Sequence, residues 1–250
     1  MGLAATALAA LALASPVSFL QAQQRADGSY GDPQSTAWVL LALHAKGIAD
    51  APAESWLRDR AGSLRTPTDV ALAALALGGP PELLDRLPRT GPTPNAAFWT
   101  ILALRAGGRA VPAETVRYVL AGQAKSGGFA WARGVAADSN DTAAAIEALR
   151  AAGVSGRTVT RALAFLARFQ NRDGGFSLTR GRASDSQSTA WAIQAYLAAG
   201  KRPPKAAYRF LARMLQPDGS YRYSARYAST PVWVTAQVVP ALAGKAFPLS

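Results

Sequence analysis

Few residues of this chain could do chemistry, and two acidic ones stand close together. Asp138 and Asp141 flank Asn140 where an apolar segment begins. Carboxyl groups can act as acids or bases in catalysis, but at the start of a helix they commonly accept hydrogen bonds from backbone N–H groups. We favour helix capping by Asp141 or Asn140, as by Ser188 and Thr230 in later segments, and keep acid chemistry as the alternative.

The remaining inventory excludes several kinds of site. The chain has no cysteine and a single histidine, His44. A zinc cluster of cysteine and histidine is therefore excluded, and a Ser-His-Asp triad would have to use His44. His44 lies near the end of a predicted helix, where a surface position is the simpler interpretation. We expect no metal site and no cofactor.

Aromatic residues form the second candidate group. Each of them falls in the first turns of a predicted helix: Trp38, Phe98, Trp99, Trp191 and Trp233. Trp38 and Trp191 even occupy the same position, nine residues before a glycine that closes the helix. If these turns face a common opening, they predict an aromatic-lined cup for an apolar ligand. Packing between helices is the alternative for each of them.

The elements that must position these residues are repeated. Similar segments start at Phe19, Tyr118, Phe165 and Phe210, each with a helix, a glutamine, a glycine turn and an aromatic residue. A second helix then starts at a capping residue and ends at glycine. Two eroded copies span 54–79 and 82–108. The six second helices are expected at Thr36–Gly47, Thr68–Gly78, Asn95–Gly107, Asp141–Gly153, Ser188–Gly200 and Thr230–Gly244.

The two helices of each repeat differ in polarity. The second helices are apolar nearly all round, which indicates burial on several sides. The first helices carry arginine on one face, as at Arg161 and Arg209, and so belong outside. An open superhelix would expose the apolar helices, whereas a ring buries them. We therefore predict an all-α fold, an α/α toroid of six inner and six outer helices, as a single domain over residues 15–250.

The N-terminal residues 1–14 are uncharged and end in a small-x-small pattern. We favour a signal peptide, and with it a secreted or extracytoplasmic location over a cytoplasmic one. An extra N-terminal helix is the alternative. Twelve apolar residues are too few to span a membrane.

The chain is basic, with 27 lysines and arginines against 15 acidic residues and a net charge of +12. These charges are spread along the chain without a dense run, so a solvated basic surface is the first interpretation. Attraction to an anionic ligand, or peripheral contact with an anionic membrane surface, is the alternative. We expect no nucleic-acid partner, because no recognition motif is present.

The repeated string of glutamine, Asp-Gly turn and aromatic residue resembles the QW-type repeat of terpenoid cyclases and protein prenyltransferase β subunits. The segment from Asp138 to Ala143 is similar to the Asp-x-Asp-Asp-Thr-Ala motif of class II terpene cyclases such as squalene–hopene cyclase. The resemblance covers residues 16–245 and is greatest to short bacterial terpene cyclase/mutase or prenyltransferase/squalene-oxidase repeat proteins.

The resemblance implies an isomerase or transferase acting on an isoprenoid in a central apolar cavity. Its motif maps onto Asp138, Asn140 and Asp141, and in class II cyclases the middle aspartate, here Asn140, protonates the substrate. The aromatic residues would stabilise carbocations through their π-electrons. The zinc ligands of prenyltransferases, which also need a partner subunit, are absent. The second hypothesis is a non-catalytic extracytoplasmic module that binds a lipophilic or anionic ligand, or a protein partner.

Overall fold

Six helical hairpins make up the protein, whose computed structural model describes residues 14–249. The inner helices are α2 (Pro33–Ala45), α4 (Pro67–Ala76), α6 (Pro94–Ala106), α8 (Ser139–Ala151), α10 (Ser186–Ala198) and α12 (Pro231–Leu242). The outer helices are α1 (Pro16–Ala22), α3 (Ala51–Arg60), α5 (Pro81–Leu84), α7 (Ala113–Ala121), α9 (Arg157–Ala167) and α11 (Lys205–Met214). A 3-10 turn, η1 (Ala61–Ser63), follows α3.

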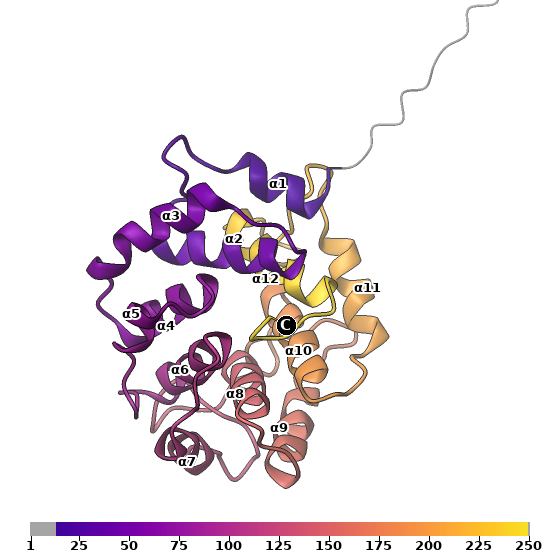
Figure 1. Ribbon diagram of the computed structural model, residues 1–250. Coiled ribbons are helices and arrows are strands. Elements are labelled where there is room, and N and C mark those ends of the chain that lie inside the picture. The colour runs from indigo at the N-terminus through magenta and orange to yellow at the C-terminus, as the bar shows by residue number, and fades with distance from the viewer. Residues whose placement is uncertain (1–13, 250) are drawn as a thin grey trace, which may run out of the picture.

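The inner helices form a closed ring (Figure 1). Each packs against the next along the chain, and α12 returns to pack against α2. The outer helices lie around them, and the chain's C-terminal end comes to the middle of the ring. The predicted α/α toroid is thus confirmed. Between residues 14 and 249 the extended segments make isolated bridges rather than strands.

Five of the six inner helices begin earlier than the sequence indicated, and α12 begins one residue later. Asp32, Thr66, Thr93, Asp138 and Asp185 cap them, each accepting a hydrogen bond from the N–H group three residues on. The predicted caps at Asn140, Asp141 and Ser188 are therefore wrong. Thr230 does precede α12, but it has a positive φ of 47° and its side chain makes no capping bond. The extended backbone before each helix puts the cap one turn ahead of the first apolar residue.

The repeated turn joins neighbouring hairpins. The glutamines Gln24, Gln123 and Gln170 donate to the carbonyl oxygens of the turn glycines at 2.9–3.1 Å. Those glycines have positive φ, and a Cβ there would meet the backbone of the next hairpin's outer helix. A Cβ added at the last one, Gly219, would lie 2.5 Å from the carbonyl oxygen of Ser15. The turns therefore close the outer layer as well.

The aromatic residue after each turn is a link to the inner ring. The backbone N–H groups of Tyr30, Phe129, Phe176 and Tyr221 donate to threonine hydroxyls on α2, α8, α10 and α12 at 2.8–3.1 Å. All four side chains are buried. These residues have structural roles and hold the inner helices in a common register.

The predicted signal peptide or extra helix at residues 1–14 lies almost wholly outside the described residues. Within residues 14–249, no helix has the length and apolar character needed to cross a bilayer.

Candidate functional site

A cavity of about 230 Å³ opens at the end of the ring where the inner helices begin. All six inner helices contribute to its wall. Its polar rim comes from the second residue of five helices, namely Gln34, Thr68, Asn95, Asn140 and Gln187. Trp233 of α12 completes the rim. The shared register of the helices therefore turns a repeated sequence position into a ring of side chains.

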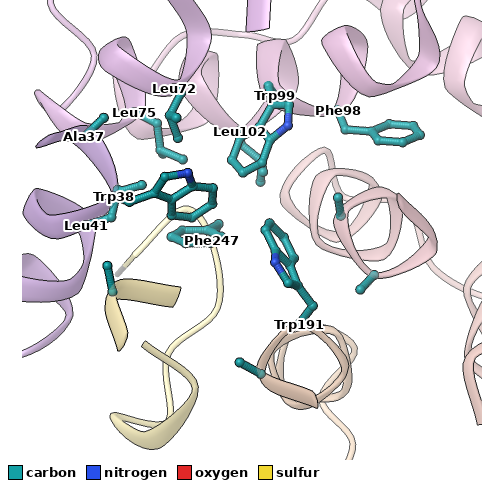
Figure 2. Close-up of a cluster of buried hydrophobic side chains, with 14 of the residues drawn as sticks. Ala37, Trp38, Leu41, Leu72, Leu75, Phe98, Trp99, Leu102, Trp191 and Phe247 are labelled. Atoms are coloured by element: carbon teal, nitrogen blue, oxygen red, sulfur yellow. The ribbon is translucent and has the colours of Figure 1, made fainter. Parts of the chain in front are cut away.

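Tryptophans form the floor of this cavity one turn deeper. Trp38, Trp99 and Trp191 are the sixth residues of α2, α6 and α10, and all three are buried. Their ring centroids lie 5.5–5.8 Å apart in edge-to-face pairs (Figure 2). Leu72 and Ala144 occupy the same position on α4 and α8. Such edge-to-face contacts stabilise the floor without closing the space above it.

Two further contacts fix the tryptophans. The Trp191 indole Nε1–H donates to Gln237 Oε1 of α12 at 2.9 Å. Trp233 lies 5.9 Å from Trp38, centroid to centroid. Trp233 is only half-buried, so it stands at the edge of the opening. It also borders a second, larger groove of about 520 Å³ beside α12.

The C-terminal tail fills the ring below the tryptophans. Phe247 lies 5.9–6.2 Å from Trp38, Trp99 and Trp191 (Figure 2). Its backbone N–H donates to Glu147 Oε2 on α8 at 2.7 Å. The sequence analysis did not identify Phe247. The apolar stretch of residues 246–249, beyond the glycine that closes the last hairpin, was the available signal.

Glu147 is a fully buried carboxyl group at the centre of the ring. Its Oε1 atom has no hydrogen-bond partner. Burial raises the pKa of Glu147 to about 8, and the hydrogen bond from Phe247 opposes this only in part. Glu147 lies beneath the tryptophan layer and does not line the cavity.

The acidic segment divides into two roles. Asp138 caps α8, accepting from the Asp141 N–H at 2.8 Å, and does not line the cavity. Asn140 and Asp141 both line it. The Asp141 Oδ1 atom accepts a hydrogen bond from Asn95 Nδ2 of the neighbouring α6 at 2.7 Å. The cavity wall therefore contains one carboxyl group.

The pKa of Asp141 is unusual for an aspartate. Burial, and then the negative charge of nearby Asp138, raise the pKa of Asp141 to about 7. The hydrogen bond from Asn95 favours the ionised form and limits this rise. Burial also raises the pKa of Asp138. Burial and the charge of Asp138 thus both favour the protonated form of Asp141.

A comparison with Asp69 in another hairpin indicates that Asp141 also has a structural role. Asp69 is the third residue of α4, as Asp141 is of α8, and it accepts a hydrogen bond from Gln34 of α2. Both acids therefore bridge adjacent inner helices through the second residue of the preceding helix. Only Asp141 also lines the cavity.

Phe98 is the one predicted aromatic residue that the structure places elsewhere. It points away from the tryptophans (Figure 2) and packs edge-on against Phe129 at 6.0 Å. Phe98 precedes Trp99 on α6, and successive helix residues point about 100° apart, so one of the pair faces the ring interior and the other the outer layer.

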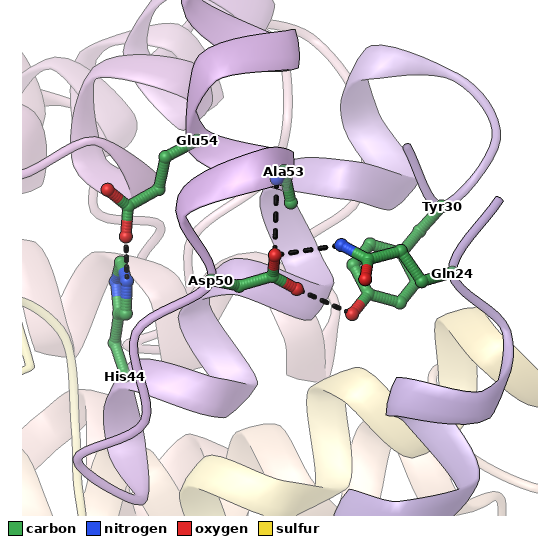
Figure 3. Close-up of polar contacts among 6 residues, drawn as sticks. All are labelled: Gln24, Tyr30, His44, Asp50, Ala53 and Glu54. Atoms are coloured by element: carbon green, nitrogen blue, oxygen red, sulfur yellow. Dashed lines mark hydrogen bonds and ion pairs between the residues drawn. The ribbon is translucent and has the colours of Figure 1, made fainter. Parts of the chain in front are cut away.

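His44 lies at the opposite end of α2, away from the cavity. Its Nε2 atom is 3.1 Å from Glu54 Oε1 of α3 (Figure 3). Nearby, Asp50 caps α3 and accepts hydrogen bonds from Gln24 and from the Tyr30 hydroxyl, at 2.8 and 2.7 Å. These contacts join the first two hairpins. No group of three or more potential metal ligands occurs within residues 14–249.

No known protein family matches the chain, and no curated protein is similar enough in sequence to be a relative. Solved structures do share its fold. A protein from Actinoplanes superposes with a TM-score of 0.69 at 18% identity, over 92% of this chain and 97% of the other. The type II terpene cyclase MstE from Scytonema gives 0.67 at 16%, over 91% and 95%. A glycosidase in complex with glucose gives 0.64 at 11%, over 92% and 94%.

The chain has the toroid fold of the type II terpene cyclases. The same fold serves a glycosidase, so it does not by itself determine the activity. The activity therefore has to be inferred from the residues that line the cavity.

Proposed function

We propose that this protein binds an isoprenoid in the tryptophan-lined cavity and starts its cyclisation by protonation, with Asp141 as the acid. One observation supports this proposal above the others. Asp141 is the one carboxyl group that lines the cavity within residues 14–249, its pKa is raised to about 7, and it lies above the tryptophan floor. MstE, which shares the fold, has been solved with the product merosterolic acid A.

The chemistry follows from these groups. The O–H bond of protonated Asp141 breaks, and the π-electron pair of a substrate alkene forms a C–H bond with that proton. The second alkene carbon is left positively charged. A further alkene of the same chain attacks this carbon and closes a ring. A carbon next to the final cation then loses a proton to water, which restores a double bond, and Asp141 regains a proton from solvent. The reaction is an isomerisation, with no net gain or loss of atoms.

The cavity wall suits the cationic intermediate. Trp38, Trp99, Trp191 and Trp233 line the space in which the charge develops. A contact between a cation and the face of an aromatic ring contributes about 2 kcal/mol or more when water is excluded. Among residues 14–249, Asp141 is the one ionisable side chain that lines this wall.

The helix ends at the rim favour a binding mode in which the apolar end of the ligand lies inside the cavity. Five inner helices already use a side-chain oxygen to bind a first-turn N–H group. Fewer N–H groups therefore remain for an anion such as a diphosphate at the helix ends. The longer part of the substrate would lie in the adjoining groove, which shares Gln187 and Trp233 with the cavity.

The test is incubation with geranylgeranyl diphosphate and with squalene, with and without Mg²⁺, followed by mass spectrometry of the extracted products. We expect a cyclic product from the parent protein. Asp141→Asn keeps an oxygen for the Asn95 hydrogen bond but has no proton to donate, and should lower the rate about 100-fold or more. Asp69→Asn, at the same helix position outside the cavity, is the matched control and should retain activity.

A non-catalytic ligand-binding role is the second candidate, and Asn140 is the observation that favours it. An amide stands in the cavity wall where the resembling motif has its acid. In that case an isoprenoid should quench tryptophan fluorescence on binding, equally in the parent and in Asp141→Asn, and no product should form.

A further inference from the structure

Three loops at the cavity end of the ring share an unusual composition. They precede α8, α10 and α12 and span residues 130–137, 177–184 and 222–229. We call them the mouth loops. None of them contains an aspartate or a glutamate, although the chain has 15 acidic residues.

Backbone hydrogen bonds place the mouth loops beside the cavity. The carbonyl oxygen of Trp131 accepts from the N–H group of Asn95, in the first turn of α6, at 3.2 Å. In the same way Leu178 accepts from Ser139 of α8 at 3.1 Å, and Tyr223 accepts from Ser186 of α10 at 2.7 Å. Each loop therefore crosses the N-terminal end of the preceding inner helix, where the cavity opens.

The mouth loops expose large apolar side chains. Trp131 is 54% exposed and Tyr227 is 52% exposed, with Val135 and Leu178 at 42% and 41%. Within residues 14–249 the other exposed side chain of this kind, Leu242, lies at the opposite end of the ring. Single exposed apolar residues are common, but their concentration around one opening indicates an interaction surface.

Arginines accompany these apolar tips. Arg133, Arg180, Arg182 and Arg226 are all exposed, one or two on each loop. Arg226 stacks over the ring of Tyr227, with its guanidinium carbon 5.3 Å from the ring centroid. The exposed large apolar side chains at this end of the ring all belong to these three loops, so the apolar character is confined to one half of the mouth.

We propose that the mouth loops dock this protein on the surface of an anionic phospholipid bilayer. Tryptophan and tyrosine are the side chains that favour the membrane–water interface, and arginine attracts acidic headgroups. Three separate tips around one opening suit a flat, deformable surface better than a pocketed protein surface. Docking in this orientation turns the cavity towards the membrane, so that an apolar ligand can enter it without crossing water.

The docking does not depend on the proposed chemistry, because vesicle binding requires no turnover. The experiment is flotation of the full-length protein with vesicles of mixed phosphatidylglycerol and phosphatidylcholine, and with vesicles of phosphatidylcholine alone. We expect binding to the anionic vesicles that weakens with salt and is much weaker on the neutral ones.

Two pairs of variants separate the contributions of the loops. Arg180→Ala with Arg182→Ala should lower vesicle binding about 10–30-fold, whereas Lys201→Ala with Arg202→Ala, exposed at the opposite end, should have little effect. Trp131→Ala with Leu178→Ala should lower it at least about tenfold, and Leu242→Ala should not. Circular dichroism checks that each variant is folded.

Several results would overturn the proposal. They are absence of binding to the anionic vesicles, an equal loss in the opposite-end variants, or full binding by the variant lacking Trp131 and Leu178. If the variant lacking Trp131 and Leu178 binds vesicles fully, and the protein binds soluble heparin as tightly as it binds vesicles, the basic loops bind a soluble polyanion instead.

Discussion

At the scale of single residues, environment rather than residue type distinguishes the candidate acid. Asp141 and Asp69 occupy the same helix position and make the same kind of inter-helix hydrogen bond. Asp141 differs because it faces an apolar cavity and lies close to the charge of Asp138, and both effects raise its pKa. The sequence singled out the acidic segment as a candidate, but it could not rank Asp138 and Asp141.

The hydrogen bond from Asn95 makes a prediction about pH. Asn95→Leu removes a donor that favours ionised Asp141, so the pKa of Asp141 should rise. If protonated Asp141 is the acid, the alkaline limb of the rate profile should move up by roughly one pH unit. Gln34→Leu removes the equivalent amide next to Asp69, and its limb should stay in place. A limb unmoved in Asn95→Leu would argue against Asp141 as the titrating group.

Buried Glu147 makes a prediction about stability. Its pKa is about 8 in the folded protein and near 4.5 when unfolded, so the folded state binds more protons between these values. The free energy of unfolding should therefore fall as pH rises from 5 to 8, by roughly 3–4 kcal/mol from this group.

Glu147→Gln keeps an oxygen for the Phe247 N–H and removes the ionisation. Urea denaturation at several pH values should show a flatter dependence and higher stability at pH 8 than in the parent. Burial also raises the pKa values of Asp141 and Asp185, so part of the slope, with the same sign, should remain. The surface variant Glu114→Gln should leave the slope unchanged, and a slope equal to the parent's in Glu147→Gln would contradict the account.

At the scale of elements, the helix starts position the site. A cap one turn before the apolar stretch puts polar residues at the second helical position and tryptophans at the sixth, so the cavity acquires a polar rim and an aromatic floor. Five of the helices start one to three residues earlier than the sequence predicted. Capping and apolar periodicity both mark a helix start, and here the polar first turn separates the two signals.

The C-terminal tail packs against the tryptophan floor of the cavity through Phe247. Phe247→Ala should lower stability by about 3 kcal/mol and open the space beneath the tryptophans. It should also let the protein bind or convert longer isoprenoids, measured by fluorescence quenching with prenyl alcohols of increasing length. Phe247→Leu, which still fills much of the space, is the graded control. If Phe247→Ala leaves the preferred ligand length unchanged, the tail does not limit how deeply a ligand can bind.

At the scale of the whole molecule, closure of the ring makes the hairpins interdependent. Each inner helix has a neighbour on both sides, and α12 lies between α10 and α2. In an open solenoid, loss of a terminal repeat removes only that repeat and one interface. In a ring, it exposes two apolar helix faces at once.

Ring closure therefore predicts the outcome of truncation. A chain that ends at residue 230 lacks α12 and the C-terminal tail with Phe247. We expect it to lose nearly all of its helical circular dichroism and its cooperative thermal transition. Retention of about five-sixths of the helical signal with a cooperative transition would instead indicate that the hairpins fold as independent repeats.

The sequence by itself determined the helical repeat, the inner and outer roles and the ring, because apolar periodicity, glycine turns and buried faces are local properties that add up to one packing solution. Only the tertiary structure decided which groups meet. Trp38, Trp99 and Trp191 converge while Phe98 turns away, and Asp141 rather than Asp138 faces the cavity. Phe247 reaches the centre from the chain's far end. Such meetings depend on the angular register of six helices around a closed ring, and side-chain burial and pKa values follow from that register.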